Sequence, residues 1–462
     1  MVNMKILISG GTGLVGKELG KALVKNGHEL FVLTRSPEKS IVYTPYPHTP
    51  VFWEAAKTAI PGEIMSQMDG VINMAGRGIA DKRWTSNYKS KLFNSRVVGT
   101  QNLVRAANEH GDNLKFFIST SAVGYYGPTQ EEAVTEDAPA ANDFLGKLCK
   151  AWESPVLHNL ESRFRQVILR VGVVLSEKGG ALSKMAGPIQ AGIGGALGNG
   201  QQGMPWIDID DLVKMFILAV DTSLEGTYNA VAPNPVSNKE LTDLIGLSLG
   251  CKPGPSVPGF ALRMAVGPMA STLLGHQSVS AEKILNAGFY FDCPKIEDSL
   301  SLRLIPMEKA ERLDVFEQWV PADPKTIFPF FADANNLEKI TPKKLQFKIL
   351  SCSTENVEKD TRIEYQIRLS GIPMTWVTHI DRWEPPHAFS DNQLKGPYKK
   401  WHHTHLFEPL AGGTLMTDRV LSIVPMGRFG KVVAGWKVYG DVSEIFAHRH
   451  QVIAETFGNS QR

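Results

Sequence analysis

The sequence predicts an α/β domain built on a doubly wound parallel sheet, followed by an α+β domain with an antiparallel sheet. Over the first 230 residues, short apolar runs alternate with longer stretches of helical period, which is typical of βαβ units. After Arg303 the pattern changes to alternating strands that end in one long helix. A chain of 462 residues is also long enough for two or three domains.

The strands expected for the parallel sheet are short apolar runs bounded by glycine or polar residues. They cover residues 5–9, 29–34, 71–74, 116–120 and 166–170. Helices are expected between them, at 14–25, 88–109 and 144–160. In the longest of these, apolar side chains recur near the helical period, at Leu92, Val97, Leu103, Val104 and Ala107.

The rest of the N-terminal part is less regular. Residues 191–212 are rich in glycine and are expected to form an irregular loop, after which a helix begins with acidic residues in its first turn. Residues 253–303 are typical of a small helical appendage. We therefore expect a nucleotide-binding domain at 1–250, a small helical module at 251–304, a linker at 305–312 and a second domain at 313–462.

The second domain shows period-2 patterns typical of strands. They cover residues 314–320, 345–351, 362–370, 374–383, 403–410 and 415–424. A long helix is expected from about 428 to 456, with its apolar residues mostly on one side: Val438, Val442, Ile445, Phe446, Val452 and Ile453.

Composition is ordinary for a globular protein, with 43% hydrophobic and 21% charged residues. The net charge of +2 gives no electrostatic reason to expect nucleic acid or an acidic membrane surface as a partner. The four cysteines lie far apart, which favours free thiols over disulfides or a zinc site. No apolar run is long enough for a membrane span or a secretory signal, so we expect a cytoplasmic protein.

A glycine-rich turn follows the first expected strand. Gly10, Gly13 and Gly16 permit a tight turn and let the backbone approach a pyrophosphate, while the helix N-terminus offers unpaired N–H groups to the phosphates. The pattern predicts a dinucleotide site, to which Thr12 and Leu14 of the same turn also contribute. The alternative is a flexible turn without a ligand.

The kind of dinucleotide is indicated at the end of the second expected strand. NAD sites usually carry an acidic residue there, which accepts hydrogen bonds from the ribose. This chain has Arg35, with Lys39 close by, and a guanidinium can make a forked contact with a 2′-phosphate. NADP(H) is therefore favoured over NAD, the alternative being a solvated arginine at a strand end.

Small residues follow the third expected strand. Asn73, Ala75 and Gly76 suit a backbone that passes close to the adenosine of a dinucleotide. An ordinary turn from strand to loop explains the same residues equally well.

These pieces, in this order, resemble the extended short-chain dehydrogenase/reductase family, and within it an epimerase-like subgroup with a small C-terminal module. The resemblance covers about residues 1–304 and implies a Rossmann-like fold. It is carried by SAVGYYG at 121–127, DFLGKLCKAWE at 143–153, ILRVGVVLS at 168–176, WIDIDDLV at 206–213 and YNAVAPNPVSNKE at 228–240.

The resemblance implies which residues do the chemistry, and one of them is missing. In the family, a Ser or Thr orients the substrate oxygen and a Tyr-x-x-x-Lys pair carries out acid–base work. Ser121 and Lys147 match the hydroxyl and the lysine, but Asp143 stands in the place of the tyrosine. An ionised aspartate could accept a proton but would be a poor donor to an alkoxide. Asp143 and Lys147 could also form an (i, i+4) ion pair on the helix.

Two other tyrosines could supply the missing phenol. Tyr125 and Tyr126 follow Ser121 in the loop expected beside the nicotinamide, although Tyr126 also matches the ordinary Tyr-Gly turn of the family. Trp206 and Asp208, in the glycine-rich segment, could border the substrate, but each is more readily explained as structural.

The second domain resembles the START-like, polyketide-cyclase-like (SRPBCC) superfamily, a helix-grip fold. This resemblance implies an apolar cavity and a hydrophobic ligand. Within it, His403 and His405 share one face of a strand and His402 points the other way. Polar residues at the cavity mouth explain these histidines better than a metal site does, so no metal is predicted.

The sequence as a whole predicts an NADP(H)-dependent oxidoreductase or epimerase-like enzyme acting on a carbonyl or hydroxyl of a small molecule, fused to a hydrophobic-ligand-binding domain. The alternative is a non-catalytic NADP(H) sensor, which the substitution at Asp143 favours.

Overall fold

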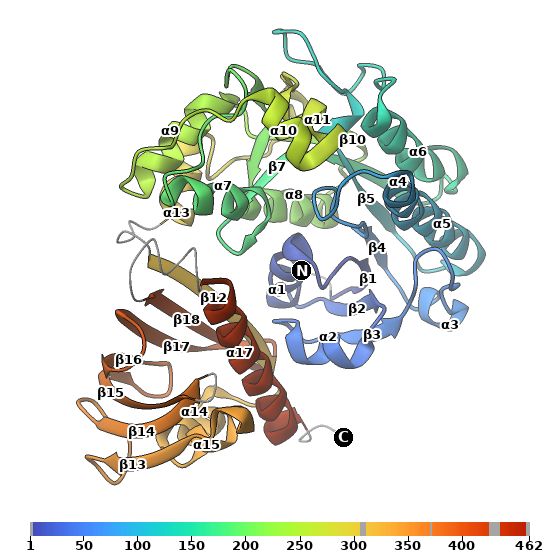
Figure 1. The fold of residues 1–462 in the computed structure, drawn as a ribbon. Helices are drawn as coiled ribbons and strands as arrows, with labels where there is room; N and C mark the ends of the chain where they lie inside the picture. The colour runs from blue at the N-terminus through green and yellow to red at the C-terminus, as the bar shows by residue number, and fades with distance from the viewer. Residues whose placement is uncertain (1–2, 305–310, 370–371, 425–434, 459–462) are drawn as a thin grey trace. The chain divides into compact units, whose positions relative to one another are not determined.

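The computed structural model describes residues 3–304, 311–369, 372–424 and 435–458 (Figure 1). The chain forms two compact units. The first, here the N-terminal unit, comprises Met1–Pro37 and His48–Pro306, and the second, the C-terminal unit, comprises Glu38–Pro47 and Met307–Arg462. The linker expected at 305–312 lies mostly outside the described residues, and its last two residues already belong to a strand.

The N-terminal unit is built on a seven-stranded sheet in the order β10-β6-β5-β4-β1-β2-β3, with every pair parallel. The chain winds outward in both directions from β1 and β4, which confirms the doubly wound α/β class. The strands are β1 (Lys5–Ser9), β2 (Glu29–Thr34), β3 (Thr49–Phe52), β4 (Gly70–Asn73), β5 (Phe116–Ala122), β6 (Arg165–Val171) and β10 (Gly226–Ala230).

Helices cover both faces of this sheet (Figure 1). The long helix expected at 88–109 is present, but a π-helical turn, Asn94–Val98, divides it into α4 (Ser86–Phe93) and α5 (Gly99–His110). α5 and α6 (Phe144–Asn159) pack their apolar side chains against the strands in one core cluster. On the other face α1 (Leu14–Lys25) packs beside α8 (Ile209–Asp221).

Shorter elements complete the unit. They are α3 (Gly62–Met65), β7 (Val173–Ser176), α7 (Gly180–Gln190), β8 (Gly203–Met204), β9 (Trp206–Asp208), β11 (Val236–Ser237) and α9 (Asn238–Ser248). The short α2 (Pro37–Tyr43) lies between β2 and β3 in the chain, but all of it except Pro37 belongs to the C-terminal unit. The expected helical appendage comprises α10 (Gly259–Val266), α11 (Ala270–Leu274), α12 (Glu282–Asn286) and α13 (Ile296–Arg303). The glycine-rich segment is more regular than expected, because β8 and β9 lie within it.

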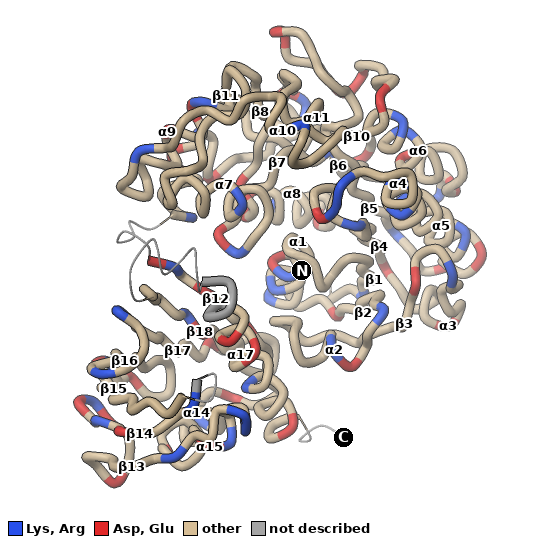
Figure 2. Tube along the Cα trace, in the orientation of Figure 1, with Lys and Arg blue, Asp and Glu red and all other residues tan. Residues whose placement is uncertain are grey.

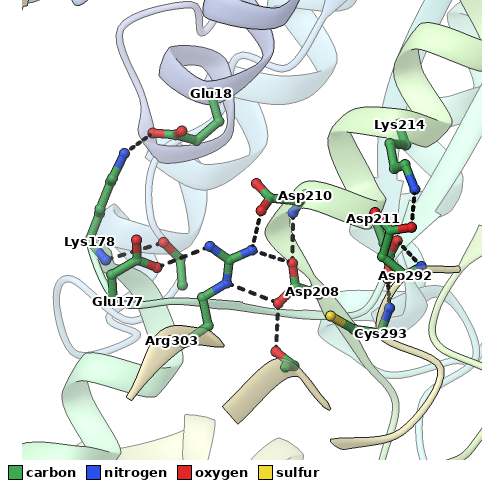
Figure 3. Close-up of polar contacts among 12 residues, drawn as sticks. Glu18, Glu177, Lys178, Asp208, Asp210, Asp211, Lys214, Asp292, Cys293 and Arg303 are labelled. Atoms are coloured by element: carbon green, nitrogen blue, oxygen red, sulfur yellow. Dashed lines mark hydrogen bonds and ion pairs between the residues drawn. The ribbon is translucent and has the colours of Figure 1, made fainter. Parts of the chain in front are cut away.

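The appendage is attached through two buried aspartates (Figure 3). Asp208 caps α8 and accepts hydrogen bonds from Ser299 (2.6 Å) and from Arg303 (2.6 and 3.0 Å). Asp211 accepts from the backbone N–H groups of Asp292 (2.8 Å) and Cys293 (2.9 Å). Asp208, a possible substrate contact from the sequence, therefore has a structural role.

The C-terminal unit is a seven-stranded antiparallel sheet in the order β12-β18-β17-β16-β15-β14-β13. Its strands are β12 (Glu311–Val320), β13 (Lys348–Cys352), β14 (Arg362–Leu369), β15 (Ile372–Glu384), β16 (Ala388–Lys395), β17 (Lys400–Leu410) and β18 (Gly413–Ile423). β16 was not expected, because Ser390, Asp391 and Asn392 interrupt its apolar pattern. The sheet and its helices confirm the predicted α+β class.

Among the described residues that follow β12, the helices beside this sheet are α14 (Pro324–Ala332), α15 (Asn336–Lys339) and the long α17 (Gly435–Phe457). The expected start of the last helix, at about 428, lies outside the described residues. Phe446 of α17 stacks on Phe316 of β12 at a ring separation of 4.1 Å, which places the helix against the sheet.

Acidic and basic positions are interspersed over each unit (Figure 2), in keeping with the net charge of +2. None of the described helices is both long enough and apolar enough to cross a lipid bilayer.

Candidate functional site

The glycine turn between β1 and α1 has no room for side chains. Gly10 has φ +79°, and a Cβ atom there would lie 2.8 Å from the Met74 carbonyl. A Cβ atom on Gly16 would lie 2.3 Å from the Gly10 oxygen. Both positions therefore require glycine, as the dinucleotide interpretation predicts.

The N-terminus of α1 is available to an anion. Its N-cap residue is Gly13, and no side chain caps the helix. The N–H groups of the first turn and the positive end of the helix dipole are thus not used by a capping side chain. Thr12 is exposed and Leu14 half-buried at this turn.

Arg35 lies at the same edge of the sheet. It follows β2, whose Leu33 is aligned with Ser9 of β1, so Arg35 and the glycine turn both leave the carboxyl ends of adjacent parallel strands. Its side chain is exposed. This placement suits a guanidinium that contacts a 2′-phosphate.

The buried side chain of Asn73 forms hydrogen bonds that hold the neighbouring strands together near the candidate cofactor site. Its amide oxygen accepts from Ser9 Oγ (2.7 Å), and its nitrogen donates to Thr100 Oγ1 (2.8 Å) and Ser119 Oγ (3.1 Å). Ser9 Oγ in turn accepts from the N–H of Ala75 (3.1 Å). The side chain of Asn73 therefore joins β1, β4 and β5 and is occupied within the protein, and Ala75 and Gly76 follow it beyond the carboxyl end of β4.

Ser121 is buried at the end of β5 with an unpaired hydroxyl. It is 3% exposed, and Oγ has no hydrogen-bond partner of ordinary geometry in the described residues. The thiol of Cys149 lies beside it, and burial and the carboxylate of Glu153 raise the pKa of this thiol to about 12. A neutral thiol is a weak partner, so the hydroxyl of Ser121 is left for another group.

Asp143 is the N-cap of α6. Its Oδ1 accepts from the Gly146 N–H over 2.7 Å. No ion pair joins it to Lys147 among the described residues, so the (i, i+4) pair considered from the sequence is not formed. Lys147 is exposed one turn into the helix. The sequence contained the signal for this role, since aspartate directly before a helix is a preferred N-cap.

Tyr126 is held in a buried polar network. Its hydroxyl donates to Asn229 Oδ1 (2.6 Å) and accepts from Arg170 Nη1 (2.8 Å), while Arg170 makes a forked pair with Glu153 (2.8 and 2.9 Å). Burial raises the pKa of Tyr126 to about 12 despite the nearby Arg170. Such a phenol is poorly suited to moving a proton near neutral pH.

Tyr125 differs from its neighbour. It is half-buried, and its ring lies against the guanidinium of Arg170, 3.6 Å from ring centroid to Cζ. Its backbone oxygen accepts from the Ala141 N–H (2.8 Å), which places it beside the segment that leads to Asp143. Its hydroxyl makes no hydrogen bond within the described chain.

Arg96 was missed by sequence reasoning. Its guanidinium lies over the ring of Trp152 (5.0 Å) and donates to the Arg77 carbonyl (2.9 Å), but Nη1 is buried without a partner in the described residues. A Cβ atom on Gly76 would lie 2.9 Å from its Cζ. Arg96 is thus a second cation beside the candidate cofactor turn, and only the tertiary structure identifies it.

The C-terminal unit encloses a cavity of about 400 Å³. Most of its lining is aromatic or aliphatic, including Leu337, Ile380, Trp376 and Phe446. A polar group formed by Asp391, His403, His405 and Arg449 lies on its wall. The cavity agrees with the expectation of an apolar ligand site, and the histidines line its wall.

Behind that wall, Asp418 is 3% exposed. Burial alone would raise its pKa, but Arg449 and hydrogen bonds from both imidazoles outweigh burial and hold the pKa well below its usual range. Burial, together with the neighbouring His405, lowers the pKa of His403 to about 4, so this imidazole is neutral at physiological pH.

Comparison with known proteins matches three segments of the chain to protein families. Residues 6–230 match the NAD dependent epimerase/dehydratase family, residues 257–301 a domain of unknown function (DUF1731), and residues 320–441 the family described as polyketide cyclase / dehydrase and lipid transport. An epimerase family protein of Mycobacterium leprae is 33% identical over 300 residues, covering 64% of this chain and 94% of the relative. One of Bacillus subtilis is 33% identical over 304 residues, covering 64% and 97%.

Solved structures agree with these matches. The crystal structure of the human epimerase family protein SDR39U1 with NADPH is 30% identical, with a TM-score of 0.59, over 65% of this chain and 98% of that one. A UDP-glucuronic acid 4-epimerase of Bacillus cereus, 18% identical with a TM-score of 0.53 over 64% and 96%, shares the fold. Both resemblances drawn from the sequence are confirmed.

Proposed function

Because the chain belongs to the NAD dependent epimerase/dehydratase family, we propose that its N-terminal unit is an NADP(H)-dependent oxidoreductase or epimerase-like enzyme acting on a carbonyl or hydroxyl of a small molecule. The observation that carries the proposal is the buried, unpaired hydroxyl of Ser121 at the same sheet edge as the glycine turn. A buried polar group without a partner is costly, and a substrate oxygen would satisfy it. The NADPH in the human relative supports the choice of cofactor.

The residues present fit this cofactor. Gly10, Gly13 and Gly16 let the diphosphate approach the N-terminus of α1, with Thr12 and Leu14 beside it. Arg35 binds the 2′-phosphate. Ala75 and Gly76, on the turn that Asn73 fixes, border the adenosine, and Lys147 binds the nicotinamide ribose. The bound nicotinamide supplies or accepts a hydride.

Ser121 orients the reacting oxygen, and Tyr125 is the phenol placed to exchange its proton. Tyr125 is chosen over Tyr126 because the hydroxyl of Tyr126 is already paired with Asn229 and Arg170. Asp143 takes no part in proton transfer in this assignment. Its cap fixes the first turn of α6, on which Lys147 stands.

The C-terminal unit, on the same proposal, binds an apolar small molecule in its cavity. Its apolar lining and its match to a lipid-transport and cyclase family support this role. Tethering would raise the effective concentration of such a molecule near the N-terminal unit if both act on it.

Measuring the turnover of NADPH tests the enzyme proposal. The full chain is titrated with NADPH by fluorescence, and the nicotinamide absorbance is then followed with a panel of apolar ketones and aldehydes. We expect Ser121→Ala and Tyr125→Phe to bind NADPH normally but to lose turnover. Tyr126→Phe and the exposed Ser90→Ala serve as matched controls that should keep it.

A second function is favoured by one observation, the aspartate in the place of the family tyrosine. In that case the unit is an NADP(H) sensor without turnover. Tight NADPH binding with no oxidation over the whole panel, in the unmodified chain, would favour the sensor over the enzyme.

A further inference from the structure

Four polar side chains meet on the inner face of the C-terminal sheet. His403 and His405 lie two residues apart on β17, so they share a face, and their cross-strand partners are Asp391 of β16 and Asp418 of β18. Arg449 reaches the same group from α17. All five residues are buried or nearly so.

Asp418 fixes how both imidazoles are protonated. Its Oδ1 lies 3.0 Å from His403 Nε2 and 2.8 Å from His405 Nδ1, which are hydrogen-bond lengths. A carboxylate at neutral pH only accepts, so where these nitrogens are bonded to Asp418 they are the donors. The remaining nitrogens, His403 Nδ1 and His405 Nε2, then carry lone pairs.

Those two lone pairs face a third acceptor. Asp391 Oδ2 lies 3.6 Å from His403 Nδ1 and 3.5 Å from His405 Nε2, and one potential ligand atom from each of the three residues lies within 4.8 Å of the other two. These separations are too long for hydrogen bonds. When both imidazoles donate to Asp418, three acceptors converge with no proton between them, and they repel one another unless a cation lies among them.

The separations fit a metal ion. Ligand atoms about 2.1 Å from a tetrahedral centre lie about 3.4 Å from one another, close to the distances from Asp391 to both imidazoles. We propose that Asp391, His403 and His405 form a binding site for a divalent transition-metal ion, with Asp418 as the outer carboxylate that orients both imidazoles. Metal-bound histidines in proteins usually donate their second N–H to such a group.

Position and charge support the same assignment. Asp391, His403 and His405 line the cavity, whereas Asp418 does not. Any coordination position of the metal that the protein leaves open would therefore face the cavity. Among the described charged residues, Asp391 and Asp441 line the cavity and Asp418 contacts its polar group, so three carboxylates face the single guanidinium of Arg449, an excess of two negative charges. A divalent cation neutralises that excess.

Arg449 offers the one competing arrangement. Its Nη2 lies 3.0 Å from His405 Nδ1, and if it donated there, His405 Nε2–H would point at Asp391 and no cation would be required. Because a guanidinium only donates, the two arrangements exclude each other. In the metal site His405 Nδ1 donates to Asp418 (2.8 Å), and Nη2 of Arg449 is left to the same carboxylate, 3.5 Å away. The Co²⁺ titration decides between the two arrangements. The site goes beyond the proposed functions and does not depend on either.

Cobalt(II) titration of the full chain tests the site. The protein is dialysed against a chelator, and binding is followed by the visible d–d absorption of Co²⁺ and by competition with Zn²⁺. We expect one equivalent to bind. Asp418→Asn should weaken binding roughly 10- to 100-fold, and His403→Ala or Asp391→Asn should weaken it more. His402→Ala is the matched control, because His402 is adjacent on β17 but pairs with Asp381.

The outcomes are distinct. Loss of the Co²⁺ spectrum in the His403, His405 and Asp391 variants, with folding checked by circular dichroism and the His402 control unchanged, supports the site. Co²⁺ binding that is absent from the unmodified chain, or equal in the unmodified chain and the His403→Ala variant, overturns it and leaves a hydrogen-bonded cluster. Because no turnover is measured, failure of the site is separate from failure of the enzyme proposal.

Discussion

Asp143 accepts a hydrogen bond from the backbone N–H of Gly146 over 2.7 Å, and this contact begins helix α6. We expect Asp143→Ala to lower the free energy of unfolding by about 0.5–2 kcal/mol, because an N–H of the first turn loses its partner. Asp143→Asn, which keeps an acceptor of the same shape, should cost much less. Urea denaturation followed by fluorescence measures both. Equal losses in the two variants would show that the negative charge of Asp143 stabilises the helix and that its capping hydrogen bond does not.

The glycine turn gives the sharpest steric prediction. In Gly16→Ala the new Cβ atom would lie 2.3 Å from the Gly10 oxygen and 2.6 Å from Gly11 Cα, so the turn must move. We expect NADPH binding, measured by fluorescence titration, to fall by at least about tenfold, which corresponds to 1.4 kcal/mol.

A matched glycine lies in α7. Gly187 has no atom within 4 Å of a new Cβ, so Gly187→Ala should leave NADPH binding unchanged and should stabilise the helix slightly. If Gly16→Ala binds NADPH as tightly as Gly187→Ala does, the turn is not the diphosphate site.

Arg35 tests the choice of cofactor. A guanidinium gains a charge-assisted contact with the 2′-phosphate that NAD lacks, so Arg35→Asp should reverse the preference for NADPH over NADH. The ratio of the two dissociation constants is the measurement. Lys25→Asp makes the same charge change at the far end of α1 and should leave the ratio unaltered, whereas an unaltered ratio in Arg35→Asp contradicts the NADP(H) assignment.

Local patterns in the sequence were sufficient for most of the N-terminal fold. β1, β2 and α1 begin and end where the apolar runs and glycines indicated, because each is defined by neighbouring residues. β3 was missed since Pro50 interrupts a four-residue edge strand, a position at which proline is tolerated. β16 was missed because Ser390, Asp391 and Asn392 interrupt its apolar pattern.

The candidate sites also differ in whether the sequence alone could locate them. The glycine turn could be located from the sequence because it directly follows a recognisable strand, and Ser121 was indicated by the family resemblance of SAVGYYG. The cluster around His403 could not, because it depends on the register that sets Asp391 opposite His403 and Asp418 opposite His405. Arg96 likewise meets Gly76 only through the packing of the helix that begins at Ser86.

Arg303 pairs with three carboxylates, those of Asp208, Asp210 and Glu177 (Figure 3), and the buried Asp208 and the exposed Asp210 should differ in effect. The Asp208 side chain is 0% exposed, so Asp208→Ala leaves the guanidinium poorly paired and should cost about 3–5 kcal/mol of unfolding free energy. The Asp210 side chain is 58% exposed, and Asp210→Ala should cost about 0–1 kcal/mol. Urea denaturation compares them, and similar losses would contradict the structural role given to Asp208.

The thiol of Cys149 makes stability depend on alkaline pH. Burial raises its pKa from 9.0 to about 12 in the folded chain, so between these values the unfolded chain loses a proton that the folded chain keeps. The unfolded state is therefore favoured as pH rises, and the free energy of unfolding should fall by about 1.4 kcal/mol per pH unit from this thiol. The contribution is constant below pH 9 and is lost progressively up to about pH 12.

Comparison with Cys149→Ala isolates this thiol, because alanine does not titrate and other groups contribute equally to both proteins. Urea denaturation at intervals from pH 8 to 10.5 should give a steeper decline for the unmodified chain, and the difference between the two slopes is the quantity of interest. Parallel slopes would mean that the thiol ionises as readily in the folded chain as in the unfolded one. In that case Cys149 would be a reactive thiolate beside Ser121. The hydroxyl of Ser121 would then already have a strong hydrogen-bond partner, which is the role proposed for the substrate oxygen.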